Sequence, residues 1–166
     1  MLYTLSVDVS FIYMATDLHN LIIVESPSKA KTLKRFLGDD YQIEASVGHI
    51  RDLPKNELGV DVDNGFKPTY VASKDKSKVI TQLKKLLKNA STLYLATDPD
   101  REGEAIAWHL MELLDPKIPV KRLAFHEITK TAIQESFDHI RDIDQSLVSA
   151  QEARRILDRL WGYLVS

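Results

Sequence analysis

The sequence predicts an α/β fold in which a mostly parallel sheet is covered by helices on both faces. As far as Phe125, short continuous apolar runs, which are typical of buried parallel strands, alternate with amphipathic helical stretches. Beyond Phe125 the apolar spacing is that of helices alone. We therefore expect an N-terminal extension at 1–20, an α/β domain at 21–127 and the start of an incomplete α-helical domain at 128–166.

The composition is that of a small globular chain with balanced charge. The chain has 166 residues, 44% of them hydrophobic, and a formal net charge of −2, so any surface for a polyanion must be local. It has no cysteine, which excludes disulfides, thiolate zinc sites and cysteine nucleophiles and fits a reducing cytoplasm. No apolar run approaches the ~20 residues that span a bilayer. Met14 is typical of an ordinary protein start and no secretory signal precedes it, so we expect residues 1–13 to be dispensable.

The first predicted strand ends at an acidic residue. Residues 21–24 form a continuous apolar, β-branched run, and Glu25 follows it directly. Ser26 and Pro27 are typical of the N-cap and first position of a helix, and Lys29 lies one turn into that helix. Glu25 is thus expected at the carboxyl edge of the sheet, where open α/β sheets bind their ligands. A capping or salt-bridged acid would also occur here, and the residues alone leave both interpretations open.

An alternating acidic cluster follows a later strand. Asp98, Asp100 and Glu102 come after the apolar run at 93–96 and before an amphipathic helical stretch, and Gly103 permits a close backbone approach. Clustered carboxylates suit a hard divalent cation, above all Mg²⁺. A single acid here would be explained by the helix dipole, but three alternating acids favour metal or phosphoryl chemistry.

The other elements are predicted from periodicity and turn signals. We expect strands at 41–47, 69–71, 92–96 and 120–125, helices around 79–87, 105–114, 129–140 and 146–166, and a polar surface excursion at 55–67. His49 lies in the loop after the second strand, and a lone loop histidine is more often incidental than catalytic.

The last predicted helix carries three arginines on one face. Arg154, Arg155 and Arg159 cluster there, with Asp158 among them. Such a face can be solvated and internally paired, but the guanidinium fork also matches phosphate oxygens, so both interpretations stand. No stop signal follows the helix before the chain ends, and we expect the chain to be a fragment.

Several motifs together resemble a known family. Glu25 and the Asp-x-Asp-x-Glu motif at 98–102 resemble the paired clusters of the Toprim domain, a Rossmann-like fold. In chain order, the blocks at 24–32, 46–54, 97–106, 125–129 and 153–159 resemble consecutive blocks of the bacterial type IA DNA topoisomerases. Several unrelated motifs in register make this a specific resemblance, which a lone acidic motif would not be.

The resemblance implies an activity and roles for residues. Type IA enzymes are ATP-independent isomerases that cut one DNA strand through a tyrosine, pass the other strand and reseal the break, which relaxes negative supercoils. By resemblance, Glu25, Asp98 and Asp100 hold Mg²⁺, Glu25 is also the general acid–base, Lys29 stabilises the scissile phosphate, and Glu102 supports the acidic cluster. The implied contacts to single-stranded DNA are His49, Arg154, Arg155, Asp158, Arg159 and Tyr163. The implied partners are single-stranded and negatively supercoiled DNA, and the implied location is the cytoplasm, with the nucleoid.

The chain also departs from the family's pattern. The nucleophilic tyrosine of the family lies in a downstream segment that this chain lacks, so we expect the chain to be inactive alone. Trp161 stands where the family usually has a smaller aliphatic residue. Two alternatives stay open: another Toprim-type nucleotidyl transferase or nuclease, and a non-catalytic module that binds nucleic acid.

Overall fold

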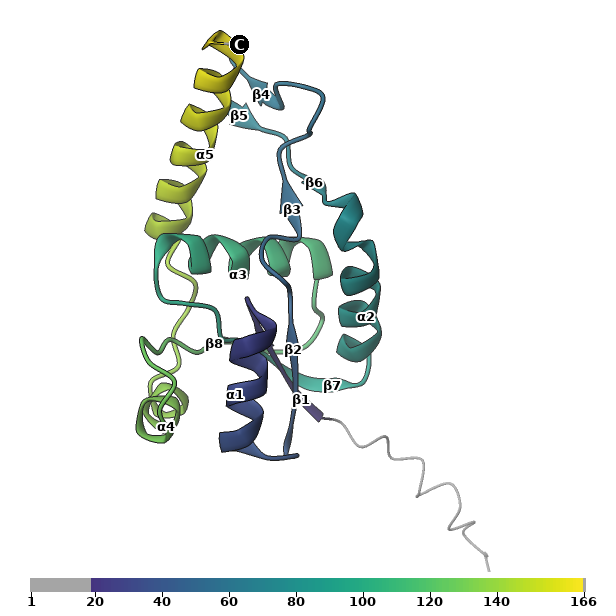
Figure 1. Cartoon of the computed structure of the whole chain (residues 1–166), viewed down its shortest axis with the longest axis vertical. Helices are drawn as coiled ribbons and strands as arrows, with labels where there is room; N and C mark the ends of the chain where they lie inside the picture. Colours follow the sequence, from purple (N-terminus) through teal and green to yellow (C-terminus); the bar gives the residue numbers. More distant parts are fainter. Residues whose placement is uncertain (1–18, 166) are drawn as a thin grey trace, which may run out of the picture.

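The computed structural model describes residues 19–165 and confirms the predicted α/β fold (Figure 1). Its strands are β1 (His19–Val24), β2 (Tyr41–Ala45), β3 (Arg51–Asp52), β4 (Val60–Asp61), β5 (Lys67–Pro68), β6 (Val71–Ala72), β7 (Ala90–Leu95) and β8 (Val120–Arg122). Its helices are α1 (Pro27–Leu37), the short 3₁₀ helix η2 (Lys74–Lys76), α2 (Ser77–Leu87), α3 (Arg101–Leu114), α4 (Lys130–Asp138) and α5 (Gln145–Val165).

The main sheet has the strand order β2-β1-β7-β8, and all of its pairings are parallel. Ile23 of β1 lies opposite Leu95 of β7, so these two central strands end at the same edge. Parallel neighbours require crossover connections: α1 lies between β1 and β2, α3 lies between β7 and β8, and the longer β2–β7 segment returns the chain to the centre of the sheet. The residues that follow β1 and β7 are therefore neighbours in space although they are far apart in sequence.

Alternating residues of the central strands build a core on each face of the sheet. Leu21 and Ile23 of β1 pack with apolar residues of α2 and α3, whereas Ile22 and Val24 pack with α1 and α4. Both sets are buried, which explains the continuous apolar run in the sequence. The predicted caps of α1 are also present, because the Ser26 side chain accepts a hydrogen bond from the Lys29 backbone N–H.

Some predicted boundaries were wrong. β8 ends at Arg122 rather than at 125, because its partner β7 ends at Leu95, whose carbonyl accepts the last sheet hydrogen bond from Leu123. Residues 69 and 70 of the predicted strand at 69–71 form the link between β5 and β6, and its last residue, Val71, begins β6. The predicted surface excursion contains β4 and the first residue of β5. The proposals for residues 1–18 lie outside the described residues, although His19 and Asn20 of the predicted extension begin β1.

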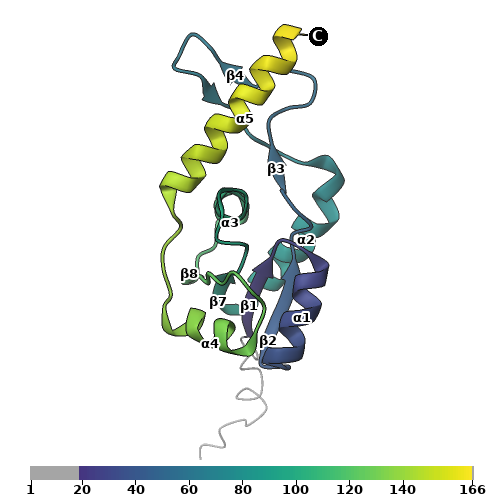
Figure 2. The same ribbon diagram turned by 60° about the vertical axis from the view of Figure 1, so that its left-hand side comes forward.

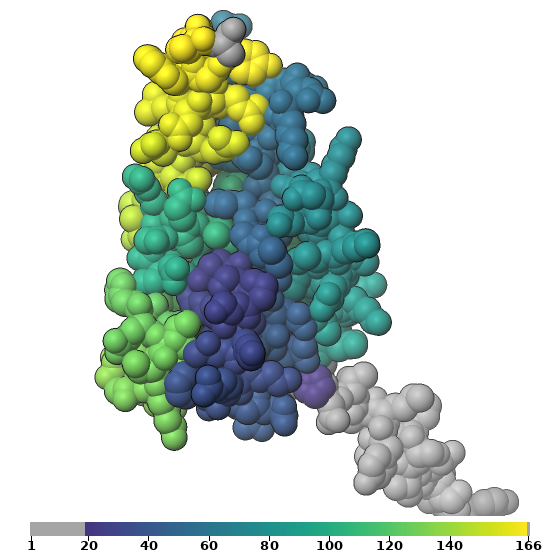
Figure 3. Space-filling view, in the orientation of Figure 1, coloured from purple at the N-terminus to yellow at the C-terminus, as the bar shows by residue number. Residues whose placement is uncertain are grey.

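Helix α5 leaves the sheet and extends away from it. It packs against α3 and continues toward β4 and β5 (Figure 2). Figure 3 shows its C-terminal half beside the β4–β5 segment at one end of the molecule. Val148 and Gln151 are its buried residues, and Trp161 is 71% exposed. The helix therefore borders the region above the sheet edge at which β1 and β7 end.

Candidate metal and nucleic-acid site

The ends of β1 and β7 bring two carboxylates to one ammonium group. Lys29 Nζ lies 3.2 Å from Glu25 Oε1 and 2.8 Å from Asp98 Oδ1. The Lys29 side chain is only 5% exposed, and its Nζ lies 4.7 Å from the centre of the Phe125 ring. Glu25 and Asp98 thus converge on a single position that a cation occupies, and here that cation is the lysine itself.

The loop between β7 and α3 is folded tightly against the first turn of the helix. Asp100 is the N-cap of α3, and its Oδ1 accepts a hydrogen bond from the Gly103 N–H at 2.8 Å. Thr97 Oγ1 donates to the Gly103 carbonyl at 2.6 Å. A Cβ at Gly103 would lie 2.0 Å from the Asp98 carbonyl oxygen, so only glycine fits this approach. The close approach predicted for Gly103 is therefore present.

The three acids of the alternating motif point to different partners. Asp98 faces Lys29, Asp100 caps α3, and Glu102 Oε2 lies 3.2 Å from His49 Nε2. Among residues 19–165, no three histidine or acidic side chains gather closely enough to form a ready metal site. Mg²⁺ in proteins is often held by only one or two carboxylates, with waters and substrate phosphates as its other ligands. The donors Glu25 and Asp98 fit that type of site, and Asp100, the third predicted ligand, uses its Oδ1 to cap α3.

A partly buried polar cluster around Arg51 and His109 was not predicted from the sequence. Arg51 Nε donates a hydrogen bond to His109 Nδ1 at 2.9 Å, and the Arg51 guanidinium lies over the rings of Tyr70 and Trp108. Burial, reinforced by the positive charge of Arg51, lowers the pKa of His109 to about 3, so the ring is neutral near pH 7. His109 lies three residues after Ile106, on the inward face of α3, and that spacing was the available signal.

The arginines of α5 make different contacts. Arg155 forms two hydrogen bonds with Asp52, at 2.8 and 2.7 Å, and Arg159 Nη1 donates to the carbonyls of Pro54 and Glu57 at 2.5 and 2.7 Å. Burial raises the pKa of Asp52. The hydrogen bonds from Arg155 and from the Leu53 backbone together lower this pKa by more than burial raises it, so the net shift is downward. These two arginines hold the loop after β3 to the helix.

Arg154 and the neighbouring residues of α5 face a cavity. Arg154 Nε lies 3.0 Å from Asp158 Oδ2, and both side chains are more than half exposed. A cavity of about 230 Å³ is lined by His49 and Glu102 together with Arg154 and Asp158. Tyr163, further along the helix, is 53% exposed. The cavity therefore connects the acidic loop with the arginine-bearing helix.

Comparison with known proteins identifies the domain. Residues 20–128 match the Toprim domain family. The chain belongs to this family. The Toprim match includes both strand ends and the whole acidic loop, and the predicted resemblance is thereby confirmed.

Curated relatives and a solved structure extend the likeness beyond the Toprim domain. The chain is 58% identical to DNA topoisomerase 1 of Streptomyces coelicolor in an alignment of length 159 that covers 88% of this chain and 17% of that protein. It is 54% identical to DNA topoisomerase 1 of Synechococcus elongatus over 160 residues, again 88% of this chain and 18% of the relative. It superimposes on full-length topoisomerase I from Thermotoga maritima with a TM-score of 0.78 and 48% identity, covering 84% of this chain and 24% of that one. The chain thus spans less than a fifth of the length of these curated relatives.

In the part of the chain that the structure describes, no helix combines the length and the apolar character needed to cross a membrane.

Proposed function

We propose that this chain is the Toprim portion of a type IA DNA topoisomerase, which holds Mg²⁺ and one DNA strand for cleavage and religation. The convergence of Glu25 and Asp98 on Lys29 is the observation that carries the proposal. The identity of more than half to proteins named DNA topoisomerase 1 supports it. In this proposal residues 128–166 begin the helical domain that borders the DNA.

The residues of the chain have distinct parts in the proposed reaction. Glu25 and Asp98 would hold the metal ion, and Mg²⁺ would supply positive charge that stabilises the phosphate under attack. The ammonium of Lys29, released from one of its carboxylates, would contact a nonbridging phosphate oxygen. Glu25 would give a proton to the leaving 3′-oxygen and take it back on religation, which is general acid–base work.

The cavity beside the acidic loop is the proposed path of the single strand. Arg154 is exposed and so is its acidic partner Asp158, so Arg154 can exchange that partner for a phosphate at little cost. Arg155 and Arg159 would act through the loop that they hold. His49 is 32% exposed and lies where the cavity meets the acidic loop. Tyr163 would offer an exposed ring on which a base can stack.

The experiment that tests the proposal is a Mg²⁺ titration of the whole chain by calorimetry. We expect the wild-type chain to bind Mg²⁺ and the Asp98→Asn variant to bind it about tenfold more weakly or worse, because one of two ligand carboxylates is lost. Asp75→Asn, which removes an exposed acid on η2, is the matched control and should bind like the wild type. Equal affinity in all three proteins would contradict the proposed site. Metal-dependent nicking without a protein–DNA adduct would instead favour a nuclease.

A further inference from the structure

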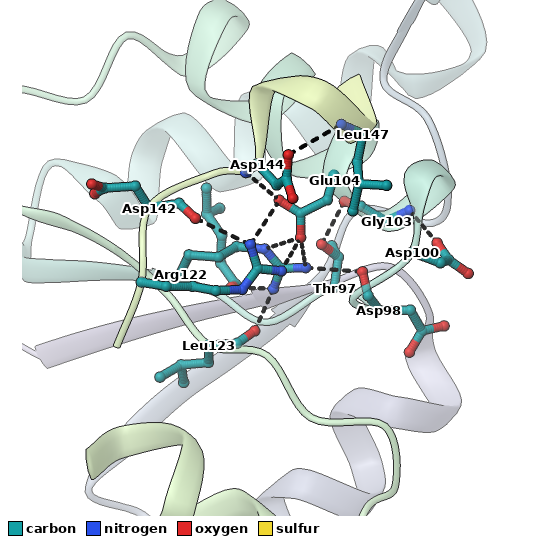
Figure 4. Close-up of polar contacts among 12 residues, drawn as sticks. Thr97, Asp98, Asp100, Gly103, Glu104, Arg122, Leu123, Asp142, Asp144 and Leu147 are labelled. Atoms are coloured by element: carbon teal, nitrogen blue, oxygen red, sulfur yellow. Dashed lines mark hydrogen bonds and ion pairs between the residues drawn. The ribbon is translucent and has the colours of Figure 1, made fainter. Parts of the chain in front are cut away.

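A fully buried ion pair lies directly behind the acidic loop. The Glu104 side chain, in the first turn of α3, and the Arg122 side chain, at the end of β8, are 0% and 1% exposed. Arg122 donates to Glu104 Oε1 from Nη2 at 2.7 Å and from Nε at 3.0 Å (Figure 4). Within residues 19–165 no hydrogen bond or ion pair joins either residue to the carboxylate of Glu25 or Asp98, although the charge of Arg122 interacts with that of Glu25. The proposed chemistry does not account for the pair.

The Arg122 guanidinium also holds the backbone of the loop. Its Nη2 donates to the carbonyl oxygen of Asp98 at 2.9 Å, and its Nη1 donates to the carbonyls of Leu95, at 3.0 Å, and Leu123. One planar group thus joins the end of β7, the end of β8 and the first acid of the loop. The Asp98 carboxylate points away from this buried cluster while its carbonyl is held by it (Figure 4). Fixing the carbonyl restricts where the carboxylate can lie.

The Glu104 carboxylate also holds the segment that leads into α5. Arg141 Nη2 lies 2.5 Å from Glu104 Oε1, and the Asp144 backbone N–H donates to Glu104 Oε2 at 3.0 Å. Asp144 Oδ1 in turn accepts from the N–H groups of Ser146 and Leu147, in the first turn of α5. The same carboxylate therefore connects the acidic loop with the arginine-bearing helix.

Stability alone does not explain such a pair. Desolvating two charges costs several kcal/mol per ion, and well-packed apolar replacements of buried ion pairs are often neutral or more stable. What an apolar replacement cannot supply is a set of directed donors toward three carbonyl oxygens. The pair therefore fixes the position of the Asp98 backbone.

We infer that Glu104 and Arg122 are positioning residues that hold Asp98 in place for the metal ion. The inference rests on the proposed function, because it assigns the pair a part in the Mg²⁺ site. Glu104 fixes the guanidinium, the guanidinium fixes the Asp98 carbonyl, and the carboxylate is thereby held beside Glu25 and Lys29. The start of α5 is held through the same carboxylate.

The test compares two Arg→Lys variants of the whole chain that both touch Glu104. Arg122→Lys keeps a positive charge beside Glu104, but one ammonium cannot reach Glu104 and the three carbonyls together. Arg141→Lys weakens another contact of the Glu104 carboxylate and leaves the hydrogen bond to the Asp98 carbonyl in place. Calorimetry gives the Mg²⁺ affinity, and amide hydrogen exchange of the metal-free protein reports the order of the loop at the Gly103 N–H.

We expect Arg122→Lys to bind Mg²⁺ about tenfold more weakly and to exchange the Gly103 amide about tenfold faster, the equivalent of one lost charge-assisted hydrogen bond. Arg141→Lys should keep both values and should speed exchange only at Asp144, Ser146 and Leu147. Equal losses of Mg²⁺ affinity in the two variants would show that the pair has only a general structural role, and would overturn the inference. Wild-type Mg²⁺ affinity and a wild-type exchange rate in Arg122→Lys would also overturn it.

Two further outcomes keep the inference separate from the proposed function and from folding. If the wild-type chain binds no Mg²⁺, the proposed function fails, while the exchange rate at Gly103 still decides whether Arg122 orders the loop. If Arg122→Lys does not fold, the inference is tested on the wild-type protein. Saturating Mg²⁺ should slow exchange at the Asp144 amide, because that N–H donates to Glu104, which is joined through Arg122 to the loop. An unchanged rate at Asp144 would contradict the inference.

Discussion

At the scale of single residues, the three arginines of α5 have different surroundings and should therefore respond differently to mutation. Arg154 pairs with Asp158 on the surface, whereas Arg155 forms a two-bond pair with Asp52 of β3. We expect Arg154→Ala to weaken binding of a single-stranded oligonucleotide about fivefold with an unchanged melting temperature, because it removes one phosphate contact. We expect Arg155→Ala to lower the free energy of unfolding by about 1 kcal/mol, because it leaves Asp52 without its side-chain donor.

Fluorescence anisotropy with the oligonucleotide and thermal unfolding measure these two effects. The expected result is that Arg154→Ala changes only oligonucleotide binding, whereas Arg155→Ala lowers the stability. A melting temperature that falls as much in Arg154→Ala as in Arg155→Ala would show that the distinction between the two arginines is wrong.

His109 gives the protein a predictable dependence of stability on pH. Burial lowers its pKa from 6.5 to about 3, so below pH 6.5 the unfolded chain binds a proton that the folded chain does not. Stability is therefore complete above pH 6.5 and falls as the pH decreases toward 3, by up to about 1.4 kcal/mol per pH unit from this group. His109→Gln, whose amide oxygen can still accept from Arg51, should flatten this part of the curve. Urea unfolding between pH 7 and pH 4.5 measures it, and parallel curves for the two proteins would refute the assignment.

At the scale of elements, the turn between β7 and α3 depends on the absence of a side chain at Gly103. Because a Cβ there would lie 2.0 Å from the Asp98 carbonyl oxygen, Gly103→Ala must move backbone, and we expect a loss of about 2–3 kcal/mol in the free energy of unfolding. Gly162→Ala in α5 is the matched control, since its Cβ meets no atom within 4 Å and alanine favours helix by about 0.5–1 kcal/mol. Chemical denaturation of both variants measures the difference. A neutral Gly103→Ala would mean that the loop is not packed as described.

The helices and strands also show which features could be predicted from the sequence. Glu25 and Asp98 could be placed together because each lies within two residues of the end of a continuous apolar run, and parallel strands end at one edge. The strands β4, β5 and β6 could not be predicted, because each has two residues and is fixed by contacts that are distant in sequence. The roles of Arg122 and Arg141 could not be predicted from the sequence either. Each occupies an ordinary polar position in the sequence, and only the folded chain brings them to Glu104.

At the scale of the whole molecule, the proposal gives this chain the metal-binding and acid–base residues of the reaction but not its nucleophile. It spans about 18% of one curated relative, and the proposed nucleophile is expected in the remainder of such a protein. We therefore expect no relaxation of supercoiled plasmid by this chain alone. Addition of the tyrosine-bearing remainder of a related enzyme should restore Mg²⁺-dependent strand cleavage, with Asp98→Asn as the inactive control. Relaxation by the chain alone, seen on an agarose gel, would overturn the expected need for a separate nucleophile.

The position of the bound metal ion is the most direct test of the central claim, that Glu25 and Asp98 form one divalent-cation site at the shared edge of β1 and β7. Mn²⁺, which binds the same oxygen ligands as Mg²⁺, broadens the NMR signals of nearby amides. Substoichiometric Mn²⁺ should broaden the amides of Glu25, Ser26 and Asp98 first, and excess Mg²⁺ should restore them. Broadening that begins elsewhere, for example at the exposed acids Asp61 and Asp63, while the signals of Glu25 and Asp98 stay sharp, would contradict the account.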